Sequence, residues 1–180
     1  MGLRLILFLV LFVFSTSETS ACFSITDDLN FVNPTLSANF DLLPDVSPFT
    51  DCWNSSIKIR SDKNGWRLIA TRVGPEPISV IGNSSENIKA EDIELTYSVT
   101  SFGMADNDGA ILVSPFGYET KLSSVGYGTL VVSGIKKSGN SCSAFNVSYY
   151  KITQKFCLFR DFVFNPGQYS GQISYLLIAP

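Results

Sequence analysis

One stretch of the chain decides the fold class, and it reads Ile93-Glu94-Leu95-Thr96-Tyr97-Ser98-Val99-Thr100. Apolar side chains occupy every second position, and the residues between them are polar. Strict alternation with a period of two is typical of a β-strand that buries one face, because successive side chains point to opposite sides. We therefore expect a strand whose inner face carries Ile93, Leu95, Tyr97 and Val99.

The same alternation recurs along most of the chain. It places Ile57 with Ile59 on one face of a strand, and Trp66 with Leu68 on one face of the next. Asn64-Gly65 between them is typical of a β-hairpin turn, because both residues tolerate positive φ. Further strands are expected at residues 77–81, 110–114, 128–134, 144–153, 156–164 and 169–178. Turns rich in Gly, Asn and Pro separate these segments, so the sequence predicts an all-β domain of eight to ten strands, a single Ig-like antiparallel β-sandwich.

The first residues have the layout of an export signal. Arg4 precedes an apolar run at residues 5–14, which is too short to span a bilayer, since a spanning helix needs about 20 residues. A polar stretch and the small residue Ala21 follow, which predicts a secretory signal cleaved after Ala21. Two alternatives stay open, a retained anchor helix and a lipoprotein that begins at Cys22.

This interpretation divides the chain into three parts and gives its location. They are a signal peptide (residues 1–21), an irregular N-terminal segment or edge strand (22–50) and the β-sandwich domain (51–180). The mature protein is expected in the periplasm or outside the cell, secreted or held at the cell surface, with no membrane span after signal cleavage.

Cysteine usage agrees with export. The four cysteines are Cys22, Cys52, Cys142 and Cys157, and an even set in an oxidising compartment predicts disulfides. Three connectivities are possible. The pairing of Cys22 with Cys52 and of Cys142 with Cys157 is preferred, because it closes the short loops of about 30 and about 15 residues.

Composition excludes several classes of function. The 180 residues carry a net charge of −3 and contain no histidine. Nucleic-acid binders need clustered positive charge, so no nucleic-acid partner is expected. Without histidine there is no Ser-His-Asp or Cys-His catalysis and no His-containing zinc site. The sequence therefore predicts no enzyme activity, no catalytic residue, no metal site and no cofactor.

Acidic residues gather at two places. Asp106-Asn107-Asp108-Gly109 has the spacing of half a calcium loop, but the terminal Glu of that loop is missing, so a turn is the preferred interpretation. Glu91, Asp92 and Glu94 are three carboxylates within four residues, and the strand pattern places Glu94 on the solvent face. Paired glycosidase carboxylates need a cleft, which nothing in this pattern indicates.

Two further features depend on the host and on exposure. Aromatic residues form 13% of the chain, enough for a sugar-binding module if Trp53, Tyr127 and Tyr149 lie exposed on one face. In a eukaryotic host, three sequons would be N-glycosylation acceptors, at Asn54, Asn83 and Asn146.

The C-terminal stretch carries the most informative pattern. A turn at Pro166-Gly167 leads into a strand in which alternate residues share one face, namely Tyr169, Gly171, Ile173, Tyr175 and Leu177. This stretch resembles the closing strand of bacterial surface β-sandwiches, the subunits of chaperone–usher pili and the related spore-coat-U-type secreted proteins. Gly167 is the fourteenth residue from the end when Pro180 is counted as the first, a position where pilin subunits often carry a glycine, and it is grouped with these residues as part of the expected assembly strand.

The resemblance implies that the antiparallel β-sandwich is pilin-like, and it implies assembly by strand addition, in which an open sheet edge accepts an extended segment from a neighbour. It also implies the partners: the chain itself, other surface subunits and a periplasmic chaperone. We therefore expect a secreted structural or adhesive surface protein that acts through protein–protein contacts, in its most specific form a pilus-like subunit. The alternative is a secreted carbohydrate- or ligand-binding β-sandwich module.

Overall fold

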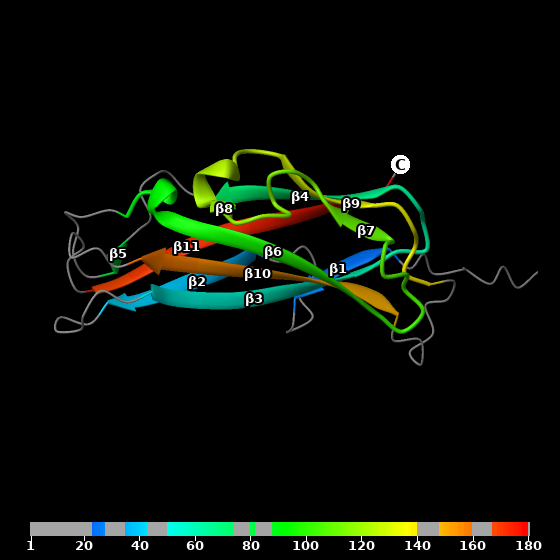
Figure 1. Cartoon of the computed structure of the whole chain (residues 1–180), viewed down its shortest axis with the longest axis horizontal. Helices are drawn as coiled ribbons and strands as arrows, with labels where there is room; N and C mark the ends of the chain where they lie inside the picture. Colours follow the sequence, from blue (N-terminus) through cyan, green and yellow to red (C-terminus); the bar gives the residue numbers. More distant parts are fainter. Residues whose placement is uncertain are drawn as a thin grey trace, which may run out of the picture.

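The structure is a computed structural model that describes residues 23–27, 35–42, 50–73, 80–81, 88–139, 148–159 and 167–179. Throughout these ranges the regular elements are β-strands and two single turns of 3-10 helix, η1 (Ala90–Asp92) and η2 (Leu122–Ser124). The strands form two antiparallel sheets, which Figure 1 shows stacked with their strands along the long axis. The predicted all-β sandwich is confirmed.

Sheet A contains five of the described strands. Their order across the sheet is β1 (Ser24–Asp27), β3 (Thr50–Arg60), β10 (Tyr149–Phe159), β6 (Ile93–Phe102) and β8 (Thr120–Lys121). The central strand β10 pairs with β3 on one side and with β6 on the other over nearly its whole length. At the two edges, β1 and β8 are much shorter than the strands that they cover.

Sheet B contains the other six described strands. Five follow the order β2 (Thr35–Leu42), β11 (Gly167–Ile178), β4 (Trp66–Val73), β9 (Thr129–Gly134) and β7 (Ala110–Leu112), and the short β5 (Val80–Ile81) also pairs with β11. The N-terminal segment thus supplies one edge strand to each sheet, β1 to sheet A and β2 to sheet B.

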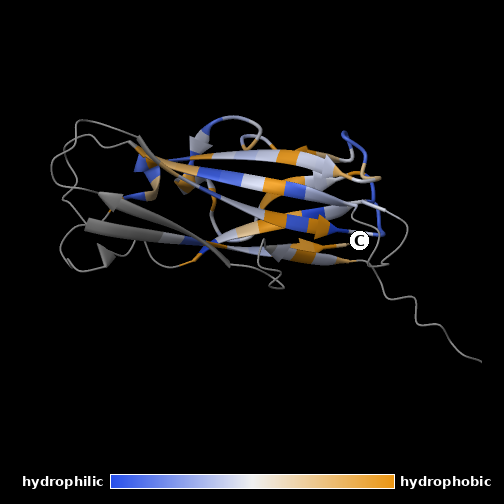
Figure 2. Ribbon diagram, turned by 90° about the horizontal axis from the view of Figure 1, so that it is seen from below, coloured by the Kyte–Doolittle hydropathy of each residue, from blue (hydrophilic) through white to orange (hydrophobic). Residues whose placement is uncertain are grey.

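The hydrophobic core lies between the sheets. Ile93, Leu95 and Tyr97 are buried on the inner face of β6, as their alternation predicts, and Val99 is partly buried. Along the strands, hydrophobic residues alternate with hydrophilic ones (Figure 2). Burial of such a side chain stabilises the fold by about 1.5–3 kcal/mol, so one inner face per sheet is enough to hold the domain together.

Trp66 anchors one end of the core. Its indole is fully buried, its ring centroid lies 5.5 Å from that of Tyr150, and its Nε1 donates a 3.0 Å hydrogen bond to the carbonyl of Lys136. The ring rests on the backbone of Gly134, where a Cβ atom would come within 1.8 Å of the indole. Only glycine allows this approach between β4 and β9.

Asn64-Gly65 forms a turn, but the hairpin predicted there is wrong. Gly65 has the expected positive φ of 76°, yet the turn joins β3 of sheet A to β4 of sheet B. The backbone of Ser61 bonds elsewhere: Ser138 donates from its amide to the Ser61 carbonyl (2.8 Å), and the Ser61 amide donates to Ser138 Oγ (2.9 Å). These bonds turn the chain across the sandwich, so β4 cannot pair with β3.

The two strands predicted at residues 144–153 and 156–164 form one strand, β10, within the described range 148–159. The apparent break was Gln154, a polar residue at an inner position. Its side chain is only 1% exposed, and it is satisfied there, because Nε2 donates to Ser55 Oγ (2.7 Å) and Oε1 accepts from the Tyr175 hydroxyl. A hydrogen-bonded polar group can occupy a core position without ending the strand.

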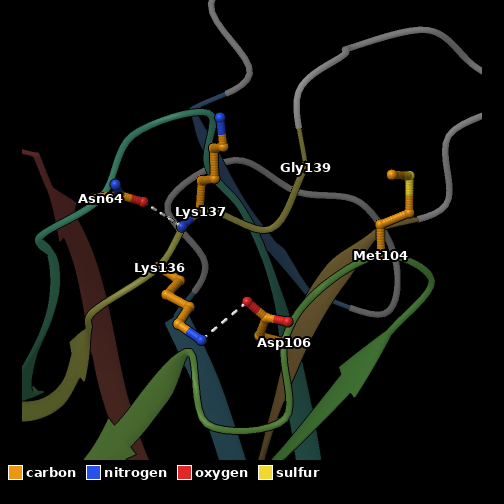
Figure 3. Close-up of a pocket in the computed structure, with 6 residues that line it drawn as sticks. All are labelled: Asn64, Met104, Asp106, Lys136, Lys137 and Gly139. Carbon is orange, nitrogen blue, oxygen red and sulfur yellow. Dashed lines mark hydrogen bonds and ion pairs between the residues drawn. The ribbon is translucent and has the colours of Figure 1, made fainter.

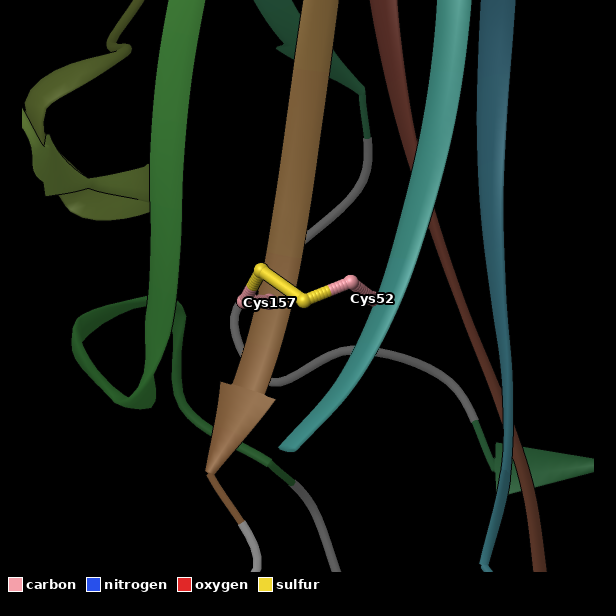
Figure 4. Close-up of a disulfide and its surroundings, with 2 residues drawn as sticks. All are labelled: Cys52 and Cys157. Carbon is pink, nitrogen blue, oxygen red and sulfur yellow. A yellow bond between two sulfur atoms is a disulfide. The ribbon is translucent and has the colours of Figure 1, made fainter. Parts of the chain in front are cut away.

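The predicted disulfide pairing is also wrong. Cys52 is bonded to Cys157, 105 residues away in the sequence. In the register of β3 with β10 these residues lie directly opposite each other, with Cα atoms 4.2 Å apart, and Figure 4 shows the bridge between the two adjacent strands. Strand pairing, not loop length, decides the partner. Cys22 and Cys142 lie outside the described residues.

Candidate interaction surfaces

Strand β11 contains the residues that the sequence assigned to assembly. Ile173, Tyr175 and Leu177 are buried on its inner face, and Gly171 is partly buried; the side-chain environments of Gly167 and Tyr169 lie outside the described part. The backbone of β11 pairs with β2 over residues 167–174, and with β5 and β4 on its other side. Its hydrogen-bonding groups are therefore engaged within the chain over most of its length.

The outer side of sheet B is aliphatic. We call the following residues the aliphatic face: Ile69, Val73, Ile111, Leu130, Leu176 and Ile178. Leu176 is 51% exposed and pairs with Ile69, which pairs with Leu130, so an aliphatic row crosses three strands. Among the described side chains on this side, the charged one is Arg67.

Sequence reasoning missed the aliphatic face, although a signal for it was present. The stretch Tyr175-Leu176-Leu177-Ile178 is apolar at consecutive positions, and successive side chains of a strand point to opposite faces, so half of these side chains cannot face the core. Tyr175 and Leu177 face the core, while Leu176 and Ile178 face outwards. A strand that is apolar on both faces indicates a second surface to be covered.

Sheet A leaves one edge uncovered along β6. Strand β8 pairs only with Glu94 and Leu95, so in the described part of the chain residues 97–101 have no backbone partner on that side. We call residues 97–101 the free edge. They carry no charge, proline or glycine, the features with which proteins protect exposed edges against pairing.

The outer side of sheet A is polar and basic where β3 meets β10. Four cations occupy outward positions there: Lys58, Arg60, Lys151 and Lys155. The outward positions of residues 52–60 and 149–157 contain no carboxylate. At one end of these strands Tyr149 stacks on Phe102, with ring centroids 4.7 Å apart, and Lys58 Nζ lies 5.9 Å from the centre of the Tyr149 ring. Pairing of distant segments thus concentrates positive charge that the net charge of −3 conceals.

Trp53, Tyr127 and Tyr149 do not form the row that a sugar-binding module would present. Tyr127 is 96% exposed but lies in the loop after η2, far in the chain from β3 and β10. Trp53 is partly exposed at an inward position of β3, opposite Phe156, whereas Tyr149 points outwards and is half-buried. These three side chains therefore belong to three different surroundings.

The Asp106–Asp108 turn holds a lysine. Lys136 Nζ lies 3.1 Å from Asp106 Oδ2 and 3.2 Å from Asp108 Oδ1. The hydrogen bond from Lys136 lowers the pKa of Asp108, and the bonds to Asp106 and Asp108 raise the pKa of Lys136. Like the turn at Asn64, this segment crosses between the sheets, from β6 to β7.

A pocket of about 290 Å³ opens beside this ion pair (Figure 3). Its lining is Asn64, Met104, Asp106, Lys136, Lys137 and Gly139. Figure 3 shows Lys136 extended towards Asp106, and Asn64 Oδ1 accepts a 2.8 Å hydrogen bond from the Lys137 amide. The polar groups that line the pocket thus bond largely to one another.

The other acidic residues are divided among separate contacts. Glu91 pairs with Lys89 (3.3 Å), and Glu94 faces outwards and pairs with Lys121 (3.2 Å). A hydrogen bond with Glu94 raises the pKa of Glu119 on the exposed surface. No group of three potential metal ligands occurs within the described ranges.

Two remaining expectations concern glycosylation and the membrane. Asn54 is exposed on the outer side of β3, opposite Lys155, while Asn83 and Asn146 lie outside the described residues. None of the helical turns between residues 23 and 179 that the structure describes is long and apolar enough to span a membrane. Comparison of the chain with protein-family models, with curated proteins and with solved structures found no match.

Proposed function

We propose that this chain is a secreted structural or adhesive surface protein that acts through protein–protein contacts made by the aliphatic face of sheet B. The observation that carries the proposal is the row formed by Leu130, Ile69 and Leu176 across β9, β4 and β11. Its partners are other copies of the chain or other surface subunits.

The physical reason is the cost of leaving this face in water. Leu176, Ile178, Val73 and Ile111 are each between 42% and 51% exposed. Apolar patches that join several strands mark protein-binding sites, because covering each Å² yields about 25 cal/mol. Since Arg67 is the only charged residue among the described side chains of this face, a partner would lose little hydration of charged groups on binding there.

Two further features support an exported surface protein. The Cys52–Cys157 bridge ties β3 to β10, and disulfides persist in oxidising compartments. The resemblance of the C-terminal strand to pilus subunits points to the same class of surface protein. Because β11 pairs with β2 over residues 167–174 and with β4 over residues 172–178, we infer that strand addition in this chain would use another edge.

The test is a substitution on the aliphatic face with a matched control. Leu176→Asp places a charge at the centre of the face, and Thr153→Asp places the same charge on the outer side of β10 in sheet A. After cross-linking of the exported protein at the cell surface, we expect higher-mass species in the native chain and in Thr153→Asp, and a marked reduction of these species in Leu176→Asp. A native chain that yields no higher-mass species, or an unchanged pattern in Leu176→Asp, contradicts the proposal.

The Tyr149–Phe102 stack favours a second candidate function, a ligand-binding module on the outer side of sheet A. Stacked rings beside Lys58, Arg60 and Lys151 have the chemistry to hold a sugar with an acidic group. Titration with uronate-containing oligosaccharides tests it, and an absence of binding, or binding that Tyr149→Ala leaves unchanged, rejects it.

A further inference from the structure

We propose that residues 97–101 of β6 pair antiparallel with the same residues of a second copy of this chain, joining the two A sheets edge to edge. The inference goes beyond the proposed function, because it concerns a different surface and names the partner. It begins from the free edge, whose amide and carbonyl groups have no described backbone partner on the side away from β10.

The free edge is suited to accept a strand. Its residues are Tyr97, Ser98, Val99, Thr100 and Ser101, all uncharged and several of them favoured in strands. An exposed edge that lacks lysine, proline or a bulge is a template for pairing with another chain. The other described edge strands differ: β1 has four residues and contains Asp27, β2 has eight and contains Asp41, β7 has three and β8 has two.

The sequence of the free edge is compatible with itself in the antiparallel sense. A two-fold axis at Val99 places Val99 opposite Val99, Ser98 opposite Thr100 and Tyr97 opposite Ser101. No like charges meet, and pairs of Ser with Thr are favourable across strands. A two-fold axis closes the assembly at two copies, because each edge is used once.

The pairing also fits the two ends of the free edge. At its beginning the turn before β8 bounds it, since Lys121 pairs with Glu94 and Thr120 with Leu95. At its end the chain turns away at Gly103, which has a positive φ of 65°. The five residues between these points are the ones that the two-fold axis at Val99 brings together.

Burial gives a second, independent reason. On the inner side of β6, Ile93, Leu95 and Tyr97 are at most 3% exposed, but Val99 is only partly buried, although it belongs to the same alternating series. It lies next to the uncovered side of the sheet. A second strand beside β6 would cover this apolar side chain with its own Val99.

Charge substitutions at the two outward positions test both the pairing and its register. Ser98→Glu with Thr100→Glu opposes carboxylates twice across the proposed pair, while within one copy the new Glu at 100 faces Lys151. Ser98→Lys with Thr100→Glu instead opposes Lys and Glu twice, and serves as the matched control. We expect a dimer from light scattering for the native protein and the control, and a dimer dissociation constant raised about tenfold or more for the Glu/Glu variant.

Hydrogen exchange provides a second measurement on the same samples. We expect the amides of residues 97–101 to become more protected as the native protein is concentrated, and not in the Glu/Glu variant. Circular dichroism and melting of each variant verify that the domain itself is folded.

The other outcomes overturn the proposal. A native protein that stays monomeric up to its solubility limit, a dimer that survives in the Glu/Glu variant, or loss of the dimer in both variants each contradicts it. Leu176→Asp, measured in parallel, distinguishes the two proposed surfaces. Self-association that only Leu176→Asp abolishes supports the aliphatic face and rejects the β6 pair.

Discussion

The hydroxyl oxygens of Tyr97 and Tyr175 lie 2.8 Å apart in the middle of the sandwich, and the two residues come from different sheets. Tyr175 donates onward to Gln154 Oε1, and Gln154 Nε2 donates to Ser55 Oγ. Because the one hydroxyl proton of Tyr175 is used on Gln154, Tyr97 must be the donor in the contact between the tyrosines. The core is thus crossed by a directed chain of hydrogen bonds that fixes how the sheets face each other.

Removal of either tyrosine hydroxyl should destabilise the fold, but unequally. Tyr175→Phe leaves the Tyr97 donor and the Gln154 acceptor buried without partners, whereas Tyr97→Phe leaves only an oxygen of Tyr175 without its donor. We expect losses in the free energy of unfolding of about 2–3 kcal/mol for Tyr175→Phe and about 1 kcal/mol for Tyr97→Phe. Urea unfolding measures both, and a larger loss for Tyr97→Phe contradicts the assigned direction.

The same two residues predict alkaline instability. Burial raises the pKa of Tyr97, and burial together with Tyr97 raises the pKa of Tyr175. In the unfolded chain both ionise near pH 10, so above that pH the folded state binds more protons and stability falls as pH rises. We expect a loss of up to about 1.4 kcal/mol per pH unit for each tyrosine.

Urea titrations between pH 8 and pH 11 measure this slope. Tyr97→Phe removes one of the two groups and should make the slope shallower above pH 10. An identical slope in the native protein and in Tyr97→Phe would show that lysines, and not the buried tyrosines, cause the alkaline loss.

The contact between Trp66 and Gly134 predicts that a single methyl group added at residue 134 destabilises the fold. In Gly134→Ala the new Cβ would come within 1.8 Å of the indole, so Trp66 or the backbone of β9 must shift. We expect a loss of about 3 kcal/mol or more. In the matched control Gly117→Ala, the nearest atom to the new Cβ is 3.9 Å away, and stability should stay within about 0.5 kcal/mol of the native value. Thermal melting compares them.

The register of β3 with β10 predicts the disulfide map of the mature protein. Peptides that contain Cys52 and Cys157 should be linked, and this leaves Cys22 and Cys142 as each other's only partner within the chain. Non-reducing digestion with mass spectrometry gives the map, and a link between Cys22 and Cys52 refutes it. Replacing Cys52 and Cys157 together by Ser should cost about 4 kcal/mol, because the bridge closes a loop of more than 100 residues.

Alternation predicted much of the fold, and it failed where tertiary contacts decide. The alternation of apolar residues correctly predicted that Ile93, Leu95 and Tyr97 form the inner face of β6, because the alternation of side chains along a strand depends only on local backbone geometry. At Gln154 a polar residue at an inner position led to the prediction of a strand end. Its hydrogen-bond partners Ser55 and Tyr175 are remote in sequence, so the local pattern could not show that Gln154 is satisfied there. At Asn64-Gly65 the turn was predictable, but the sheet to which the chain continues depends on bonds with Ser138.

The surfaces were harder to predict than the core. The net charge gave no indication that Lys58 and Lys151 lie opposite each other. These residues are 93 positions apart in the sequence, and the pairing of β3 with β10 brings them together. Likewise, the free edge of β6 exists only because β8 begins at Thr120, beside Leu95, and sequence patterns do not specify where β8 begins. Both features arise from pairing between distant segments.

The place of β11 inside sheet B sets the order in which this polypeptide can mature. β2 and β5 have β11 as their sheet partner, and β4 depends on it along one side. In a nascent chain, β2, β4 and β5 therefore lack this partner strand until residues 167–178 have been synthesised. Closure of the sandwich is then a late and cooperative event, which would keep the chain unfolded long enough for the export that we propose.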